Sequence, residues 1–248
     1  MDLAGKTALV TGGSRGIGAA TSKRLAREGA HVAVNYSSSP DNARAVVDEI
    51  RSTGGNAFVV QGNVASPDAV ESMFAELDQR FSEGIDILVN NAGIFELAPI
   101  TETTLADFDR TMQVNVRGVF DVTRHAVQRM NDHGRIITLG SCMGDRSMFA
   151  GSAIYAMSKS AVAGLTKGWA HDLGERGISV TCLQRGPIDT DMNPDVEDNP
   201  GAAYVKPLTT LKRFGTAEEV AELIGFLASP GGGYISGQTI TIDGGLNA

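Results

Sequence analysis

Short apolar runs alternate with longer amphipathic stretches along the chain. Apolar runs rich in Val and Ile are typical of β-strands that are buried on both faces of a parallel sheet. Seven such runs, several of them continuous, predict strands at residues 7–10, 31–35, 57–61, 85–90, 135–139, 179–183 and 239–242.

The amphipathic stretches between these runs predict helices at residues 18–27, 40–53, 67–81, 104–130, 154–175 and 217–227. The alternation of strands and helices predicts an α/β fold, a doubly wound parallel sheet with helices on both faces. No Pro/Gly/Ser-rich linker divides the chain, so residues 1–248 are predicted to form a single domain. The irregular stretch 191–213 is interpreted as a loop that covers the substrate, with room for a short helix.

The composition narrows the class of protein. Of the 248 residues, 42% are hydrophobic, which is enough to bury a substantial core. No apolar stretch reaches the ~18 residues that span a membrane, and no signal-peptide pattern is visible. The net charge of -8 argues against nucleic-acid binding, and Cys142 and Cys182 form no metal-type cluster. We therefore expect a cytoplasmic protein without a metal, a membrane contact or a nucleic-acid partner.

The first predicted strand runs into the sequence TGGSRGIG at residues 11–18. Gly12, Gly16 and Gly18 allow a tight turn through which the backbone can approach a ligand closely. The following helix points its free N–H groups at this turn, which suits a pyrophosphate. Thr21 stands where the standard G-x-G-x-x-G pattern has its third glycine. The segment predicts a dinucleotide site, and the alternative is a plain strand–helix turn.

The end of the second strand predicts which dinucleotide binds. An NAD-binding protein commonly holds the ribose 2′-hydroxyl there with an acidic residue. No acid occurs before Asp41, whereas hydroxyls and an amide are present at Asn35, Tyr36 and Ser37, and Arg15 lies in the glycine turn. An acid would repel a 2′-phosphate, while serines and an arginine would accept one, so we predict NADP(H). The alternative is an ordinary polar loop beside a solvated arginine.

Tyr155 and Lys159 are four residues apart, a spacing that places both side chains on one face of a helix. A nearby ammonium stabilises the phenolate and lowers the tyrosine pKa from about 10. The pair could therefore move a proton to or from an oxygen near neutral pH. The same spacing also occurs by chance, as an exposed lysine beside a packed tyrosine.

Together these motifs resemble the short-chain dehydrogenases/reductases, over essentially the whole chain. The matching residues occur in the family's order: TGGSRGIG, Asn90-Asn91-Ala92-Gly93, Asn115, Ser141 and Tyr155-x-x-x-Lys159. The resemblance implies a Rossmann-type fold with a seven-stranded parallel sheet, assembled as a homotetramer or dimer. It also implies hydride transfer between a nicotinamide cofactor and an alcohol or carbonyl group.

The resemblance also implies roles for the matched residues. Tyr155 would give a proton to a carbonyl oxygen or take one from an alcohol, and Lys159 would lower its pKa and bind the nicotinamide ribose. Ser141 would hold the substrate oxygen, and Asn115 would position a water molecule that connects Lys159 to solvent. The implied cofactor-binding set is Gly12, Ser14, Arg15, Gly16, Ile17, Gly18, Asn35, Tyr36, Ser37, Asn63, Val64, Asn91, Ala92, Gly93, Tyr155, Lys159, Gly186, Pro187, Ile188 and Thr190.

The chain departs from the family pattern near the site. Asn63 stands where an aspartate is usual, and its amide oxygen can still accept a hydrogen bond from the adenine. Arg185 precedes Gly186 where the family has a proline. In one interpretation Arg185 points to solvent or pairs with an acid such as Asp189, and in the other it engages the cofactor or an anionic substrate.

The predicted activity is that of an NADPH-dependent carbonyl reductase or alcohol dehydrogenase acting on a small ketone or alcohol. One alternative is 3-oxoacyl-[acyl-carrier-protein] reduction, in which Arg129 and Arg176 would dock the acidic carrier, although the net charge of -8 opposes docking. The other alternative is a signalling protein that binds a cyclic dinucleotide, because Asp145-Arg146 and residues 186–194 resemble a branch proposed to do so. The intact catalytic set argues against a pure binding protein.

Overall fold

The computed structural model describes residues 3–196 and 198–248. Residues 1, 2 and 197 lie outside this description, and with them the start of the predicted domain and one position of the predicted loop 191–213. Within it, the strands form one parallel sheet in the order β3-β2-β1-β4-β5-β6-β7. Their bounds are Thr7–Val10 (β1), His31–Tyr36 (β2), Asn56–Gln61 (β3), Ile85–Asn90 (β4), Met130–Ser141 (β5), Ser179–Arg185 (β6) and Gln238–Ile242 (β7).

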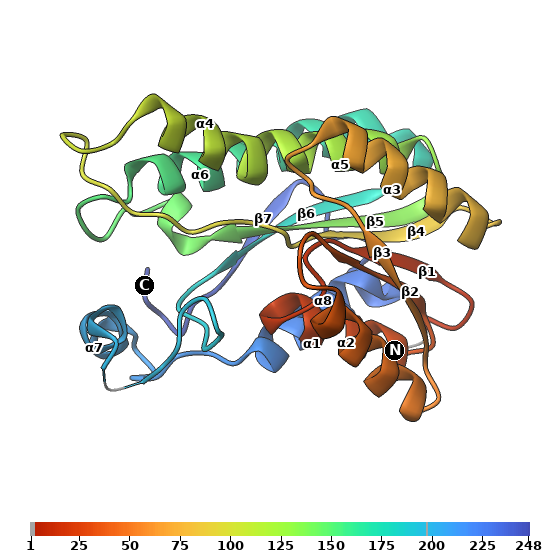
Figure 1. Ribbon diagram of the computed structural model, residues 1–248, viewed down its shortest axis with the longest axis horizontal. Coiled ribbons are helices and arrows are strands. Elements are labelled where there is room, and N and C mark those ends of the chain that lie inside the picture. The colour runs from red at the N-terminus through yellow and green to blue at the C-terminus, as the bar shows by residue number, and fades with distance from the viewer. Residues whose placement is uncertain (1–2, 197) are drawn as a thin grey trace.

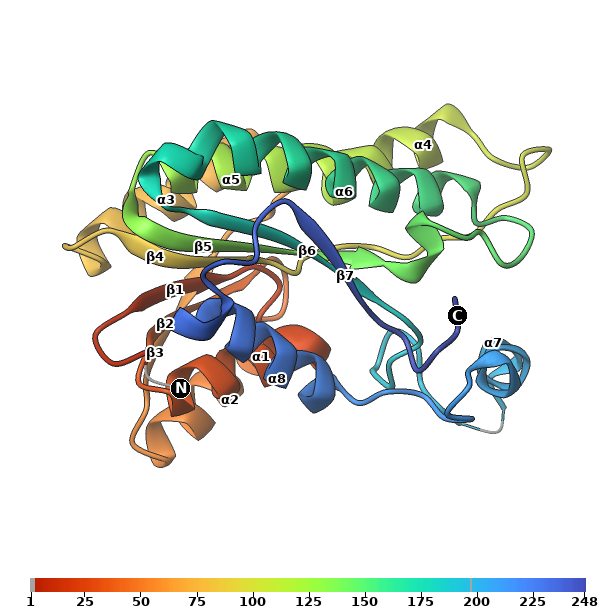
Figure 2. The same cartoon turned by 180° about the vertical axis from the view of Figure 1, so that it is seen from behind.

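Helices cover both faces of this sheet. The lower layer in Figure 1 consists of α1 (Gly16–Arg27), α2 (Pro40–Ser52) and α8 (Ala217–Ala228). The upper layer, also visible from behind in Figure 2, consists of α3 (Pro67–Arg80), α4 (Leu105–Met112), α5 (Val119–Val127) and α6 (Ala153–Leu173). The short α7 (Pro200–Val205) lies apart from both layers. The predicted doubly wound, seven-stranded parallel sheet is confirmed.

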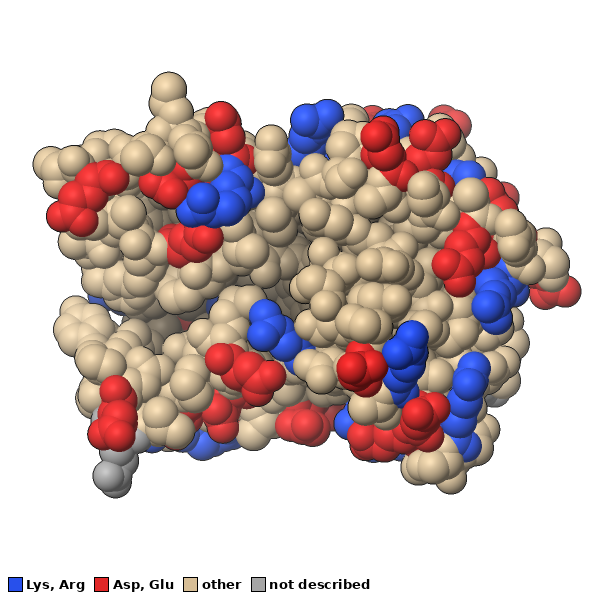
Figure 3. Space-filling model, viewed as in Figure 1, with Lys and Arg blue, Asp and Glu red and all other residues tan. Residues whose placement is uncertain are grey.

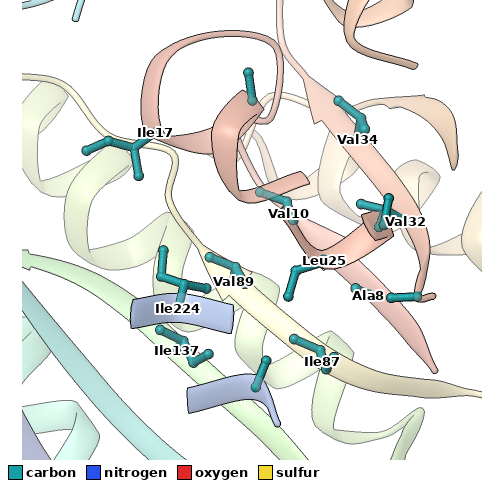
Figure 4. Close-up of a cluster of buried hydrophobic side chains, with 14 of the residues drawn as sticks. Ala8, Val10, Ile17, Leu25, Val32, Val34, Ile87, Val89, Ile137 and Ile224 are labelled. Atoms are coloured by element: carbon teal, nitrogen blue, oxygen red, sulfur yellow. The ribbon is translucent and has the colours of Figure 1, made fainter. Parts of the chain in front are cut away.

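The central strand β1 is packed on both faces, because successive side chains of a strand point in opposite directions. Ala8 and Val10 join the core cluster under the sheet, which Figure 4 shows together with Leu25 of α1 and Ile224 of α8. Leu9 joins the cluster on the other face. All three β1 side chains are fully buried. The carboxyl end of β1, where the glycine turn begins, is thus held from both sides.

The strand order reverses at β1, because β2 and β3 extend the sheet on one side and β4 to β7 on the other. At such a reversal the connections leave the carboxyl ends of the two neighbouring strands in opposite directions and open a crevice there. The segments that follow β1 and β4, which contain the glycine turn and the Asn-Asn-Ala-Gly motif, meet at this edge.

The helix predicted at 104–130 is interrupted. A π-helical segment, Gln113–Gly118, separates α4 from α5, and α5 ends before the predicted boundary. Met130 is not helical, because it opens β5 and pairs with Ile85 of β4.

In its described part, the predicted loop 191–213 contains α7 and the 3₁₀-helix Lys206–Leu208. Among the described residues, no helix has the length and apolar character that a membrane crossing requires.

Candidate active site

A cavity of about 490 Å³ lies over the carboxyl ends of β1, β2 and β4. Most of the predicted cofactor-binding residues line it: Gly12, Ser14, Arg15, Gly16, Ile17, Asn35, Ser37, Asn63, Val64, Asn91, Ala92, Gly93, Tyr155, Lys159 and Thr190. Gly186 and Pro187 line an adjoining cavity instead. Tyr36 and Ile188 are buried in the core below the sheet, and Gly18 is buried behind the glycine turn.

The glycine turn is packed too tightly for side chains. Gly12 and Gly16 have φ angles of 62° and 51°, in the left-handed region that favours glycine. A Cβ atom on Gly18 would lie 2.2 Å from the Gly12 carbonyl oxygen. The Asn91 Nδ2 spans the turn and donates hydrogen bonds to the carbonyls of Thr11 (2.9 Å) and Gly12 (3.0 Å). The loop after β4 therefore fixes the backbone that faces the cavity.

Asn35 holds the same turn from the side of β2. Its Oδ1 accepts a hydrogen bond from the Gly12 amide (3.1 Å), and its Nδ2 donates to the Gly62 carbonyl (3.0 Å). Only 1% of the residue is exposed. The sequence predicts that this amide is available to a 2′-phosphate, but in the structure its polar atoms position the cavity wall.

Arg15 and Ser37 to Ser39 line the cavity beyond the neighbouring strands β1 and β2. The Arg15 side chain is exposed and forms no hydrogen bond or ion pair with any described residue. Hydroxyl groups and a free guanidinium are suited to binding phosphate. The residues present therefore fit a dinucleotide that carries a 2′-phosphate, with its pyrophosphate at the glycine turn.

Tyr155 and Lys159 lie on α6 and are both buried. The Lys159 ammonium donates a hydrogen bond to the Leu139 carbonyl of β5 (2.8 Å) and lies 5.8 Å from the centre of the Tyr155 ring. Burial raises the pKa of Tyr155, while the positive charges of Arg185 and Lys159 lower it. Together with the Ser141 hydroxyl, they hold this pKa below its ordinary value. The phenol thus has the electrostatic surroundings that proton transfer near neutral pH requires.

Asn115 lies in the π-helical segment and is fully buried. Its Oδ1 accepts a hydrogen bond from the Ile94 amide (2.9 Å), and its Nδ2 donates to the Ile94 carbonyl (3.0 Å) and the Ser158 hydroxyl (3.2 Å). A Cβ atom on Gly93 would lie 3.2 Å from the Asn115 Oδ1 and 3.6 Å from the Lys159 ammonium. Asn115 therefore ties the loop after β4 to α6 at the point where Lys159 enters the site.

Ser141 ends β5, and its register partner in β6 is Arg185. The Ser141 hydroxyl accepts a hydrogen bond from the Met143 amide (3.2 Å) and lies beside the Tyr155 phenol. The next residue, Cys142, is buried, and burial raises the pKa of its thiol to about 11. The cysteine is therefore a neutral packing residue at ordinary pH, and the hydroxyl groups of Ser141 and Tyr155 are the groups that can hold a substrate oxygen.

Arg185 is half-buried and lines both cavities. Its guanidinium donates a hydrogen bond to the Gly186 carbonyl (3.4 Å) and forms no ion pair with any described residue. The Asp189 Oδ1 accepts a hydrogen bond from the Asp195 amide (2.9 Å). Among the described residues, Arg185 therefore forms no ion pair with Asp189, and its partly exposed side chain lines the two cavities.

The adjoining cavity has a volume of about 660 Å³ and shares Tyr155, Arg185, Thr190 and Met192 with the first. Its walls are largely apolar and include Phe95, Leu97, Met143, Met148, Phe149, Met192, Pro194, Val205, Phe214 and Leu246. Part of the predicted loop 191–213, with α7, forms one side of it. Figure 3 shows a hollow in the surface on the left, between α4 in the upper layer and the lower region that contains α7.

Sequence reasoning missed several of the residues that build the site. Ile94 and Leu139 act through backbone groups, which any residue type could supply. Val114 and Met192 line the first cavity with apolar side chains, although neither belongs to the predicted cofactor-binding set. In the sequence, only the closeness of these four residues to the motif residues could have indicated that they line or support the site.

Comparison with known proteins identifies the family. Residues 12–247 match a family model described as enoyl-(acyl carrier protein) reductase. The chain is 40% identical over 244 residues to the cyclic-di-GMP-binding biofilm dispersal mediator protein of Escherichia coli (strain K12), covering 98% of each. It is also 40% identical over 243 residues to the 3-oxoacyl-[acyl-carrier-protein] reductase FabG of Staphylococcus epidermidis, covering 97% of this chain and 98% of the relative.

Among solved structures, a short chain dehydrogenase from Burkholderia cenocepacia J2315 in complex with NADP is 45% identical, with a TM-score of 0.96 over 100% of both chains. The chain belongs to the short-chain dehydrogenase/reductase family, as its motifs predicted, and is an oxidoreductase.

Proposed function

We propose that the chain is an NADPH-dependent carbonyl reductase that converts a small ketone to an alcohol, or catalyses the reverse reaction. The observation that carries this proposal is the convergence of Ser141 and Tyr155 where the dinucleotide cavity meets the apolar cavity. The prediction of NADP(H) as the cofactor is confirmed by the NADP-bound relative. For this chain, we propose that Arg15 and Ser37 bind the 2′-phosphate and that the other predicted residues that line the first cavity hold the rest of the molecule.

The reaction adds a hydride and a proton across the carbonyl group. When bound, NADPH supplies the hydride to the carbonyl carbon. The hydroxyls of Ser141 and Tyr155 hold the carbonyl oxygen, and Tyr155 gives it a proton as the C=O bond becomes a single bond. The Lys159 ammonium, fixed by the Leu139 carbonyl, stabilises the phenolate that remains until a proton returns from solvent. Asn115 holds the loop and helix that place Lys159.

Replacement of Tyr155 by phenylalanine tests this assignment. Tyr155→Phe should lower kcat for ketone reduction by about 10²–10⁴-fold, because it removes the proton donor. The Kd for NADPH, measured by fluorescence titration, should stay near the wild-type value. Tyr234→Phe is a matched control, since Tyr234 is fully exposed. Near-normal turnover by Tyr155→Phe would contradict the proposal.

Reduction of a carrier-bound 3-oxoacyl group is the less favoured activity. Both arginines that would dock the acidic carrier are already paired: Arg129 with Asp78 (2.5 Å) and Arg176 with Asp132 (2.9 Å). A carrier would have to displace these carboxylates. Comparing kcat/KM for a 3-oxoacyl carrier protein with that for small free ketones distinguishes the two activities.

A cyclic-dinucleotide-binding function is kept as the second candidate, because the Escherichia coli relative bears that name. The Asp145 carboxylate accepts a hydrogen bond from the Gln184 side chain (3.0 Å), and Arg146 donates to the Leu246 carbonyl (3.5 Å). Calorimetry with cyclic di-GMP, with and without NADPH, tests this candidate. The absence of binding heat in both states would remove it.

We further propose that the chain forms one domain, acts in the cytoplasm and assembles as a homotetramer. Leu105, Phe108, Phe120 and Met157 support the assembly, because these apolar side chains of α4, α5 and α6 are exposed in the single chain. The loop 191–213 would cover the substrate.

A further inference from the structure

The apolar cavity is lined by one positively charged side chain. Among the described residues that line it, Arg185 alone is charged. Asp243 follows the register partner of Arg185 in β7, but its oxygens accept hydrogen bonds from the amides of Gly245 and Asn247 (2.9 Å each). A guanidinium is always protonated and carries five N–H donors. Arg185 therefore faces the cavity with a charge and donors that its neighbours leave largely unused.

The position of this charge is defined by the sheet. Ser141 and Arg185 are register partners on the parallel strands β5 and β6. Neighbouring strands lie about 4.8 Å apart, and paired residues point their side chains to the same face. A carbonyl oxygen held by Ser141 and Tyr155 therefore places the adjacent carbon atoms of the substrate within reach of the guanidinium.

We propose that Arg185 binds a carboxylate of the substrate, so that the substrates are 2-oxo or 3-oxo carboxylic acids with an apolar tail. This inference rests on the proposed reductase function and narrows its substrate class. The planar guanidinium can bind a carboxylate through two parallel hydrogen bonds. The remaining walls, among them Phe95, Phe149 and Phe214, suit an aliphatic or aromatic tail, and about 660 Å³ accommodates one. The carboxylate is unchanged by the reaction.

Two ketones test the proposal. 2-Oxo-4-phenylbutanoate and 4-phenylbutan-2-one differ only in a carboxylate that replaces a methyl group beside the carbonyl. Arg185→Gln should lower the ratio of kcat/KM for the acid to kcat/KM for the ketone by about 10- to 100-fold. Effects of the substitution on Tyr155 largely cancel in this ratio, because both compounds react at the same site.

Two further variants serve as controls. Arg185→Lys should recover part of the ratio, because it restores the charge without the planar pair of donors. Arg27→Gln should keep the wild-type ratio, since Arg27 is 68% exposed and pairs with Glu222 on α8.

An unchanged ratio in Arg185→Gln would overturn the proposal. If that variant also raised the Kd for NADPH, Arg185 would belong to the cofactor site. If the wild type oxidised NADPH with neither compound, the proposed reductase function would be in error. A binding measurement with a carboxylate ligand would then test the Arg185 site independently of turnover. In that case 4-phenylbutanoate should bind the wild-type NADPH complex about 10-fold more tightly than the Arg185→Gln complex by calorimetry. Equal affinities would refute the site.

Discussion

Gly18→Ala tests whether the nucleotide turn is as tightly packed as described. Intrinsic helix propensity predicts a gain in stability of up to about 1 kcal/mol, because Gly18 lies inside α1. The contacts predict the opposite, because the new Cβ would lie 2.2 Å from the Gly12 carbonyl oxygen and 2.6 Å from the Asn91 Nδ2. The first distance is about 1 Å shorter than an ordinary C···O contact.

The size of the effect follows from what must move. Displacing the Asn91 amide costs its hydrogen bonds to Thr11 and Gly12, worth about 1 kcal/mol each. Forcing a methyl group into a filled space adds about 2 kcal/mol. After the helix-propensity gain, the net loss is about 3 kcal/mol. For a chain of this length that lowers Tm by about 6–12 °C.

Differential scanning calorimetry of the cofactor-free protein measures this shift. Gly174→Ala is the matched control, because its Cβ would meet no atom within 4 Å and its φ of -62° suits alanine. That control should keep or slightly raise Tm. Because the Gly12 backbone would move, Gly18→Ala should also weaken NADPH binding. A Tm at or above the wild-type value in Gly18→Ala would refute the packing argument.

Two other predictions concern charge. Arg15→Gln should raise the Kd for NADPH about 10-fold and leave the Kd for NADH unchanged, because only NADPH has the 2′-phosphate; an equal change for both cofactors in fluorescence titrations would contradict the assignment. The rate of alcohol oxidation should rise with pH up to the lowered pKa of Tyr155, since the phenolate is the base. Arg185→Gln should move this rise to higher pH, because it removes the charge that contributes most to lowering the Tyr155 pKa. A pH–rate profile that did not move would show that Arg185 has no effect on the phenol.

The sheet was readable from the sequence because its strands are buried on both faces. Every residue of Ile85–Asn90 is buried, so the strand appears in the sequence as an almost continuous apolar run. Strand ends were less accurate, as at β5, where pairing with β4 rather than residue type sets the beginning of the strand. The groups at the carboxyl edge were predictable because each belongs to a motif of fixed residue types.

The orientation of Arg185 could not be read in the same way. It depends on the register that brings Ser141 beside Arg185, and on Asp243 being bound by backbone amides. These are relations between segments far apart in the chain. The sequence offered Asp189 as a partner because it is close along the chain, but the structure pairs it with the Asp195 amide. Closeness along the chain did not predict the partners of Arg185, because the pairing of strands in the sheet determines the position of its side chain.

The π-helical segment between α4 and α5 changes the phase of the helix that contains it. An α-helix turns about 100° per residue. The extra residue in the wider π-helical turn therefore rotates the side chains of α5 about the helix axis, compared with an uninterrupted helix. The apolar stripe of α5 is therefore out of step with that of α4. Deleting one residue from 113–118 would restore a regular helix and turn Asn115 or its neighbours away from Ile94. Alignments or chimeras that treat residues 105–127 as one uniform helix will misplace one of its two ends.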